Sequence, residues 1–242
     1  MTRILVFSDI HANLTALEAV LEDAGRVDAY WFLGDLVGYG PQPNECVERV
    51  RALPNLLAVM GNHDAAVLGK MPLGWFNAEA RNMIVWTQSQ LSPQNLAFLA
   101  QLPEKIITES VSLVHGSIRK PITEYVVSDS IALASMALME TPFAFVGHSH
   151  HPLCWQSEDT KTIQFCKGQN GKKVGMKPKA IFNPGSVGQP RDGDPRAAYA
   201  LYTPEEHLWE WRRVEYNISQ TQNLMLNMGL SPYNALRLAV GK

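Results

Sequence analysis

The chain has 242 residues, of which 46% are hydrophobic and 18% are charged, and its formal net charge is -2. This length and composition predict a folded α/β protein and exclude a disordered chain. The near-neutral charge provides no positive field for a nucleic acid polymer, and no apolar run reaches the roughly 18 residues that a membrane span needs. We therefore expect neither a nucleic acid polymer nor a membrane as a partner.

The first third of the chain alternates strand and helix patterns. Strands are predicted at residues 4–8, 29–33 and 56–60, and helices at residues 13–24 and 43–53. In the first helix, Leu14, Leu17, Val20 and Leu21 have the spacing of one helix face, and Gly25 ends it. This order favours parallel strands joined by helical crossovers.

The rest of the chain changes from helical to strand-rich. Helices are predicted at residues 77–90, 93–101 and 129–140, and strands at 105–108, 112–115, 143–146, 153–157, 162–166, 180–183, 198–202 and 208–214. The later strands are joined by short polar turns and favour an antiparallel sheet, with a loop tip at residues 168–173. We predict one domain over residues 1–242 with a C-terminal helical extension at about 216–240, built from two short helices.

The chain has three cysteines, Cys46, Cys154 and Cys166. An odd number of cysteines, with no apolar leader before the first predicted strand, is typical of a cytoplasmic protein. Cys154 and Cys166 could face each other across a hairpin. We interpret them as two small buried residues, because free cysteine is often buried.

Five short fragments carry most of the chain's chemical information, and four of them follow a predicted strand. They contain two Asp, one Asn and five of the seven His residues. In chain order they are Asp9-x-His11, Gly34-Asp35, Gly61-Asn62-His63-Asp64, His115-Gly116 and Gly147-His148-Ser149-His150. Because ligands gather beyond the carboxyl ends of strands in open α/β sheets, we expect these side chains to meet at one edge.

The residue types in the five fragments indicate metal chemistry. Carboxylate, amide and neutral imidazole groups bind divalent first-row metals. The set is large enough for two ions with one shared ligand and one further imidazole for proton transfer. Metal-assisted hydrolysis of a phosphate ester needs that combination.

The order, strand context and spacing of the fragments resemble the calcineurin-like metallophosphoesterase superfamily, in particular its small prokaryotic branch, over roughly residues 3–215. The resemblance implies a four-layer α/β/β/α sandwich with two mixed β-sheets flanked by helices. It also implies a metal-dependent phosphoric ester hydrolase, in which a metal-bridging hydroxide attacks phosphorus.

The resemblance assigns a role to each matched residue. It implies that Asp35 bridges two divalent ions, drawn from Mn, Fe, Zn, Co and Ni, with Mn favoured for activity. One ion would be held by Asp9, His11 and His150, and the other by Asn62, His115 and His148.

Three further residues receive roles outside the metal set. His63 resembles the family's catalytic histidine, which stabilises the leaving group, and we expect Asp64 to accept a hydrogen bond from its ring. Asn62 is also a candidate substrate-binding residue. Arg191 closes the fragment Asn183-Pro184-Gly185-Ser186-Val187-Gly188-Gln189-Pro190-Arg191 and is a candidate for binding phosphate, with a solvated turn arginine as the alternative.

The chain departs from the family pattern at two places. Ala12 stands where the family often has Gly, which matters if the backbone there needs a positive φ. Gly38-Tyr39-Gly40 stands where the Ser/Thr protein phosphatase branch has Asp-Arg-Gly. Because the arginine of that run is missing, we do not expect a phosphoprotein substrate.

The leading functional hypothesis is therefore a cytoplasmic phosphoesterase acting on a small phosphate monoester or diester, including nucleotides. A dinucleoside polyphosphate hydrolase acting on diadenosine tetraphosphate is the alternative, and a catalytically silent metal-binding or scaffold protein is the alternative from another class. Trp75 and Phe76 either cap the site for a base or ring or belong to the core. His151 and His207 lie outside the fragments, and we interpret them as ordinary structural residues.

Overall fold

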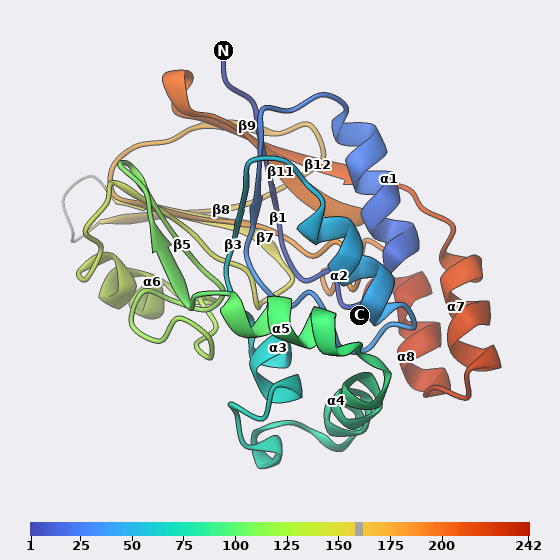
Figure 1. Ribbon diagram of the computed structural model, residues 1–242. Helices are drawn as coiled ribbons and strands as arrows, with labels where there is room; N and C mark the ends of the chain where they lie inside the picture. Colours follow the sequence, from blue (N-terminus) through green and yellow to red (C-terminus); the bar gives the residue numbers. More distant parts are fainter. Residues whose placement is uncertain (158–161) are drawn as a thin grey trace.

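Two mixed β-sheets of six strands each lie face to face, with helices on their outer surfaces (Figure 1). The computed structural model describes residues 1–157 and 162–242. The four-layer α/β/β/α sandwich predicted from the sequence is confirmed. The helices α1 (Leu14–Ala24) and α2 (Pro43–Arg51) cover one side, and α6 (Asp129–Met136) covers the other.

The first sheet has the strand order β3-β2-β1-β11-β12-β9. The first three strands are parallel to one another, and the remaining neighbours are antiparallel. Their bounds are β1 Ile4–Phe7, β2 Ala29–Phe32, β3 Leu56–Ala58, β9 Lys173–Gly175, β11 Ala197–Thr203 and β12 Leu208–Val214.

The second sheet has the strand order β4-β5-β6-β10-β7-β8. Its bounds are β4 Lys105–Ile107, β5 Val111–Val114, β6 Phe143–Phe145, β7 Pro152–Ser157, β8 Ile163–Lys167 and β10 Ala180–Pro184. β6 pairs in parallel with both β5 and β10, whereas the strands after residue 147 pair with one another in antiparallel fashion, as predicted.

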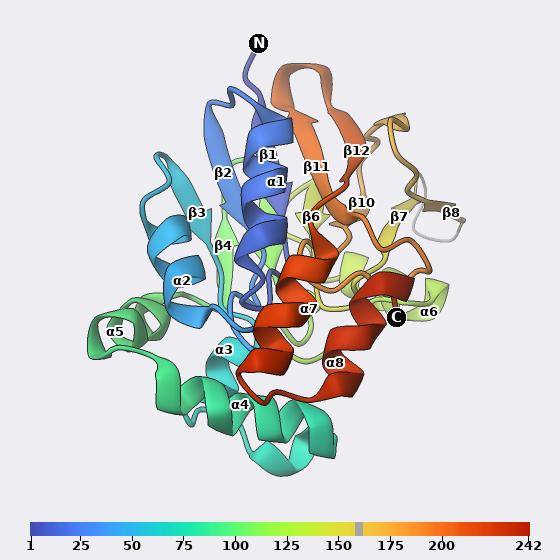
Figure 2. The same ribbon diagram turned by 90° about the vertical axis from the view of Figure 1, so that its right-hand side faces the viewer.

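The remaining helices lie beyond the sheet edges and beside α1. They are α3 Asn62–Val67, α4 Ala78–Gln90, α5 Pro93–Gln101, α7 Ile218–Asn227 and α8 Pro232–Arg237, with 3-10 turns at Leu73–Trp75, Pro204–Glu206 and Leu238–Val240. Figure 2 shows α7 and α8 beside the lower end of α1, while α3 and α4 lie below the sheets. None of the helices among the described residues is both long and apolar enough to cross a membrane.

The alternation of side chains along the strands divides the interior into layers. In β1, Ile4 and Val6 face the second sheet, whereas Leu5 and Phe7 face the helices. The layer between the sheets is rich in aromatic rings, and Trp209 and Trp211 both belong to it, as their alternation on one strand predicts. This packed layer holds the two sheets in a fixed relation, and the loops at their ends depend on it.

Two local predictions are corrected. β9 lies partly in the segment predicted as a loop tip, because residues 173–175 pair with β12 and form the edge strand of the first sheet. The helix predicted at residues 129–140 ends at Met136, where a turn leads to β6.

The prediction of two separate thiols at Cys154 and Cys166 is wrong. The two residues lie opposite each other on β7 and β8, with a Cα–Cα distance of 5.1 Å, and form a disulfide. Cys154 is buried between the sheets, whereas Cys166 is half-buried. Residue-level register, which the sequence pattern leaves open, decides this pairing.

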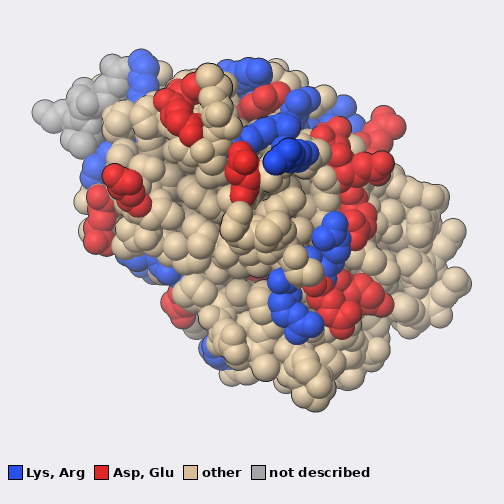
Figure 3. All heavy atoms as spheres, turned by 45° about the horizontal axis from the view of Figure 1, so that its top comes forward, with Lys and Arg blue, Asp and Glu red and all other residues tan. Residues whose placement is uncertain are grey.

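Acidic and basic side chains are interspersed on the face shown in Figure 3, without one extended field of either sign. This distribution agrees with the formal net charge of -2.

The layer between the sheets predicts a large stability effect at Phe145. Its fully buried ring contacts Trp31, Tyr202 and Trp209 at centroid distances of 5.9, 5.1 and 4.6 Å. We expect Phe145→Ala to lower the free energy of unfolding by about 3–5 kcal/mol, measured by urea denaturation. Phe165, which is 47% exposed on β8, is the matched control, and Phe165→Ala should cost about 1 kcal/mol or less. Equal costs would contradict this view of the core.

Candidate metal centre

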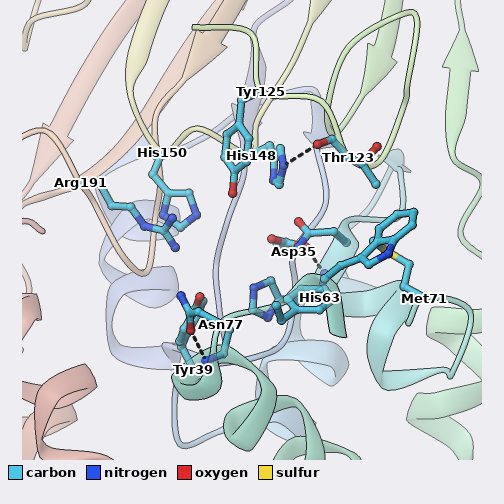
Figure 4. Close-up of a pocket in the computed structure, with 14 residues that line it drawn as sticks. Asp35, Tyr39, His63, Met71, Asn77, Thr123, Tyr125, His148, His150 and Arg191 are labelled. Atoms are coloured by element: carbon cyan, nitrogen blue, oxygen red, sulfur yellow. Dashed lines mark hydrogen bonds between the residues drawn. The ribbon is translucent and has the colours of Figure 1, made fainter. Parts of the chain in front are cut away.

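Loops at the ends of strands from both sheets bring the predicted site residues together. Asp9 and His11 follow β1, Asp35 follows β2, and His115 and His148 follow β5 and β6. Figure 4 shows Asp35, His63, His148 and His150 pointing into one space. Three groups of side chains have ligand atoms that all lie within 4.8 Å of one another: Asp9, His11 and His150; His11, Asp35 and His63; and Asp35, His115 and His148.

One half of the cluster contains Asp9, His11 and His150. The Nε2 atoms of His11 and His150 are 3.2 Å apart, and His150 Nε2 is 3.3 Å from Asp9 Oδ1. Asp35 Oδ2 is 3.6 Å from His11 Nε2. The nitrogen and oxygen atoms of this half that could bind a metal ion therefore surround one point.

The other half contains Asn62, His115 and His148. His115 Nε2 lies 3.1 Å from Asn62 Oδ1, 3.2 Å from His148 Nδ1 and 3.3 Å from Asp35 Oδ2. Asp35 Oδ2 thus reaches both His11 and His115. The structure brings together all seven residues predicted as ligands, with Asp35 between the two halves.

Backbone carbonyl groups determine which nitrogen of each cluster histidine carries a proton. A carbonyl oxygen only accepts hydrogen bonds, so the ring nitrogen that faces it must donate. The four bonds are His11 Nδ1 to Val37 O at 3.2 Å, His115 Nδ1 to Leu33 O at 2.8 Å, His148 Nε2 to Thr123 O at 3.3 Å and His150 Nδ1 to Gln189 O at 2.5 Å. In the neutral imidazoles, the nitrogens that face the cluster consequently carry no proton.

The cluster therefore contains facing lone pairs. The contact between His11 Nε2 and His150 Nε2 has no proton to share, and when His115 is neutral the same holds for His115 Nε2 and His148 Nδ1. Asp9 Oδ1 is buried without a hydrogen-bond partner among the described residues. Uncompensated lone pairs and buried carboxylate oxygens are unfavourable unless a cation lies between them. The donor set fits divalent metal ions in both halves.

The electrostatics of the cluster also favour positive charge. Burial lowers the pKa of His11 and of His150 well below the ordinary value, and that of His148 to about 3, which keeps these ligand atoms deprotonated. At His115, burial acts in the same direction, but the charge of Asp35 outweighs it and raises the pKa to about 9. The field at this point therefore stabilises a cation, whether a proton or a metal ion.

The loops that carry the ligands have unusual backbone geometry. Five of the ligand residues adopt positive φ: Asp9 at 54°, His11 at 48°, Asp35 at 59°, His148 at 64° and His150 at 60°. Ala12 also has a φ of 53°, which is the condition under which glycine is favoured there. Left-handed conformations at non-glycine residues cost about 1–3 kcal/mol each and cluster at functional sites. His148 and His150, two residues apart, are directed into different halves by these turns.

The site accepts no side chain at Gly38. Its φ is 93°, and a Cβ there would lie 2.5 Å from His63 Nδ1. The glycine therefore allows the loop after β2 to approach the His63 ring closely.

The predicted hydrogen bond between His63 and Asp64 is wrong. Asp64 Oδ2 accepts from the backbone N–H groups of Asp35 and Gly61, both at 3.0 Å, and Oδ1 accepts from Leu36 at 2.9 Å and Val37 at 3.2 Å. Consecutive residues on a helix project about 100° apart, so the two side chains diverge at the start of α3. Asp64 ties the loop after β2 to the loop after β3.

His63 lies beside the metal cluster and not between its two halves. Its backbone N–H donates to Asp35 Oδ1 at 2.8 Å, which orients the shared carboxylate. Its buried ring packs edge-on against Phe76 and is tilted against Tyr39, and Nδ1 has no hydrogen-bond partner among the described residues. Burial lowers the pKa of His63 to about 4.

Arg191 reaches the site from the loop after β10. The side chain is half-buried, donates from Nη2 to Gln189 Oε1 at 2.8 Å and lies over the Tyr39 ring at 5.8 Å. Its Nε atom is buried without a partner among the described residues. The guanidinium lines the same pocket as His63 and Asp35 (Figure 4).

The pocket over the cluster has a volume of about 210 Å³. Its lining includes Tyr39, Trp75 and Phe76, whereas the ring of His151 lies outside it and bonds Ser149 O. Sequence reasoning missed Thr123 and Tyr125, although Tyr125 stacks on His148 with a centroid distance of 3.7 Å. The aromatic residue in the loop after His115-Gly116 was the available signal.

The four bonds to Asp64 predict a structural effect of its substitution. Asparagine has one acceptor oxygen, so Asp64→Asn would leave buried N–H groups of the loops unpaired. We expect a loss of about 2–5 kcal/mol in the free energy of unfolding, measured by denaturant titration. The matched control is Asp28→Asn, since exposed Asp28 accepts from Arg3 N at 2.8 Å and needs only one oxygen. Unchanged stability of the Asp64 variant with a lower rate would instead indicate a role in catalysis alone.

Comparison with known proteins identifies the family. The calcineurin-like phosphoesterase superfamily domain matches residues 2–207. An uncharacterised protein of Methanocaldococcus jannaschii is 38% identical over 247 residues, which cover 99% of this chain and 98% of the relative. Phosphodiesterase YfcE of Escherichia coli is 27% identical over 212 residues, which cover 83% of this chain and 87% of that enzyme.

Solved structures agree with this relationship. The crystal structure of a metallophosphoesterase from Sphaerobacter thermophilus is 46% identical, with a TM-score of 0.92, and the match covers 100% of this chain and 99% of that one. A hypothetical protein of Pyrococcus horikoshii has the same fold, with a TM-score of 0.83 at 21% identity and coverage of 100% and 99%. With its strand-end cluster of histidines and carboxylates, the chain belongs to the calcineurin-like phosphoesterase superfamily.

Proposed function

We propose that the protein is a phosphoesterase that depends on two divalent metal ions and hydrolyses a small phosphate monoester or diester, nucleotides included. One observation carries the proposal: four histidines converge on the two buried carboxylates of Asp9 and Asp35, and Asp35 lines the pocket above them. Membership of the phosphoesterase superfamily supports the same reaction class.

In this proposal, Asp9, His11 and His150 hold one ion, Asn62, His115 and His148 hold the other, and Asp35 contributes to both. When bound, a pair of divalent ions supplies Lewis acidity and lowers the pKa of a water molecule toward neutrality. The backbone carbonyls that bond the four histidines fix the direction of the ligand nitrogens.

His63 is the residue that we propose stabilises the leaving oxygen. It lines the pocket beside Asp35, and its ring is held by Tyr39 and Phe76. A leaving oxygen gains negative charge as its bond to phosphorus breaks, and a hydrogen bond or proton from an imidazole stabilises that charge.

Arg191 is the proposed phosphate-binding residue. The planar guanidinium suits two phosphoryl oxygens, and its stacking on Tyr39 holds it at the pocket wall. Asn62, also in the pocket, is positioned to contact the same group.

A dinucleoside polyphosphate hydrolase is the second candidate. Arg191 also lines a neighbouring hollow together with His151 and Lys167, which offers donors for a second phosphate. A catalytically silent scaffold is disfavoured, because all seven donor residues and His63 are present and lie together.

Metal removal tests the proposed reaction. We expect chelator-treated protein to lose hydrolysis of p-nitrophenyl phosphate and bis(p-nitrophenyl) phosphate, and Mn²⁺ to restore it with two ions bound per chain. Release of p-nitrophenolate measures the rate, and diadenosine tetraphosphate is assayed in parallel by chromatography. Binding of two ions without turnover of any of these esters would contradict the enzyme and favour the scaffold.

A second test separates metal binding from proton transfer. We expect His63→Gln to retain both metal ions but to lose about 10²–10⁴-fold in kcat, because the ring that stabilises the leaving oxygen is gone. His207→Gln is the matched control, since this exposed imidazole follows the 3-10 turn at Pro204–Glu206 and lines neither the pocket nor the hollow beside Arg191, and it should keep the rate within about 2-fold. Loss of metal from the His63 variant would make His63 a ligand instead.

A further inference from the structure

Trp75 is an exposed residue whose indole lies on the wall of the pocket over the candidate metal ligands, called the metal pocket below. Its side chain is 69% exposed, whereas Trp31, Trp155, Trp209 and Trp211 are buried. Of the pocket's apolar wall, Met71 and Phe76 pack against the buried core, but Trp75 belongs to none of the buried apolar clusters among the described residues. Because this exposed indole lies at the pocket wall, its face is available to a ligand bound there.

The backbone presents this indole in a defined position. Residues 73–75 form a 3-10 turn, in which Trp75 N donates to Pro72 O and Phe76 N donates to Leu73 O, both at 3.1 Å. The neighbouring Phe76 ring anchors the turn by packing edge-on against His63 at 5.3 Å. The 3-10 turn is therefore in direct contact, through Phe76, with the side of the pocket that contains His63.

A second hollow of about 290 Å³ adjoins the metal pocket at Trp75. Met71, Trp75 and Thr123 line both spaces, so these three residues lie at the boundary between them. Apolar side chains make up most of the remaining wall, with charged residues among them: Met60, Ala65, Pro121 and Ile122, then Lys70, Glu104 and Lys120.

The two sides of the metal pocket differ in chemistry. Arg191 and Met71 lie on opposite sides of Asp35 in Figure 4. On the side of Arg191, the adjoining hollow has mostly polar and charged side chains, among them His151, Lys167 and Asp192. On the side of Met71, the adjoining hollow is largely apolar and includes the exposed indole. A phosphate ester with its phosphorus over Asp35 would therefore direct its organic group past Trp75.

We propose that this second hollow is a subsite for a planar ring, and that Trp75 selects phosphate esters of nucleosides by stacking on the base. The inference deepens the proposed function and rests on it for the position of the phosphate. Stacking suits the site because the face of an indole pairs with any nucleobase. Glu104 and Lys120 line the same hollow and can form hydrogen bonds with the polar edges of the base.

The test compares two ligands that differ only in the base. Adenosine 5′-monophosphate and ribose 5-phosphate are titrated by calorimetry into Mn²⁺-loaded protein, and both are also used as competitors of bis(p-nitrophenyl) phosphate hydrolysis. We expect the nucleotide to bind about 5- to 100-fold more tightly than the sugar phosphate, the range of one stacked base. Trp75→Ala should remove most of this preference without changing the affinity for ribose 5-phosphate, and Trp75→Phe should retain part of it.

Tyr233→Ala is the matched control, because this exposed aromatic residue on α8 lines neither hollow. It should leave both affinities unchanged. Equal affinities for the two ligands in the wild type, or a preference that survives in Trp75→Ala, would overturn the proposal. If the proposed function itself is wrong, the protein will show no metal-dependent hydrolysis of bis(p-nitrophenyl) phosphate. Calorimetry does not need turnover, so it still measures whether the protein prefers the ligand that carries a base.

Discussion

The rest of the site depends on the hydrogen bonds between four imidazoles and four backbone carbonyls. In the neutral rings, each bond places the proton on the outer nitrogen and leaves the inner nitrogen with a free lone pair. The carbonyls come from loops of both sheets: Leu33 and Val37 follow β2, Thr123 follows β5, and Gln189 follows β10. A shift of one sheet against the other would break some of these bonds, so the tautomers are a property of the whole sandwich.

The loops that hold the ligands are costly in backbone energy. Positive φ at Asp9, His11, Asp35, His148 and His150 costs about 1–3 kcal/mol per residue. Asp64 offsets part of this cost by accepting four backbone N–H groups, which fixes the loop after β2 against the start of α3. The aromatic layer between the sheets supplies the remaining support, since it fixes the strands from which the loops depart. Strain at the ligands is therefore sustained by packing far from them.

The sequence predicted the layers and the set of clustered residues because both depend on patterns that span the chain. Short apolar runs located the strands, four of the five fragments followed such a run, and the resemblance of the fragments to the family implied the layers. The failures concern relations that no local pattern encodes. His63 and Asp64 are adjacent in sequence, but the helix turns their side chains apart. Cys154 and Cys166 pair only because β7 and β8 adopt one particular register. Tyr125 joined the site through a loop without a motif.

This difference explains why the chemistry of the site is easier to infer than its substrate. The donor residues stand at the ends of buried strands, where position follows from the fold. Trp75, Thr123 and Tyr125 instead stand in connecting segments between β3 and α4 and between β5 and α6, which lie outside the two sheets. Such segments vary without disturbing the layers, so a change in them alters what fits beside the phosphate and leaves the reaction intact. In the proposal made above, the organic group is recognised in the hollow that shares Met71, Trp75 and Thr123 with the metal pocket, whereas the donor cluster acts on the phosphate alone.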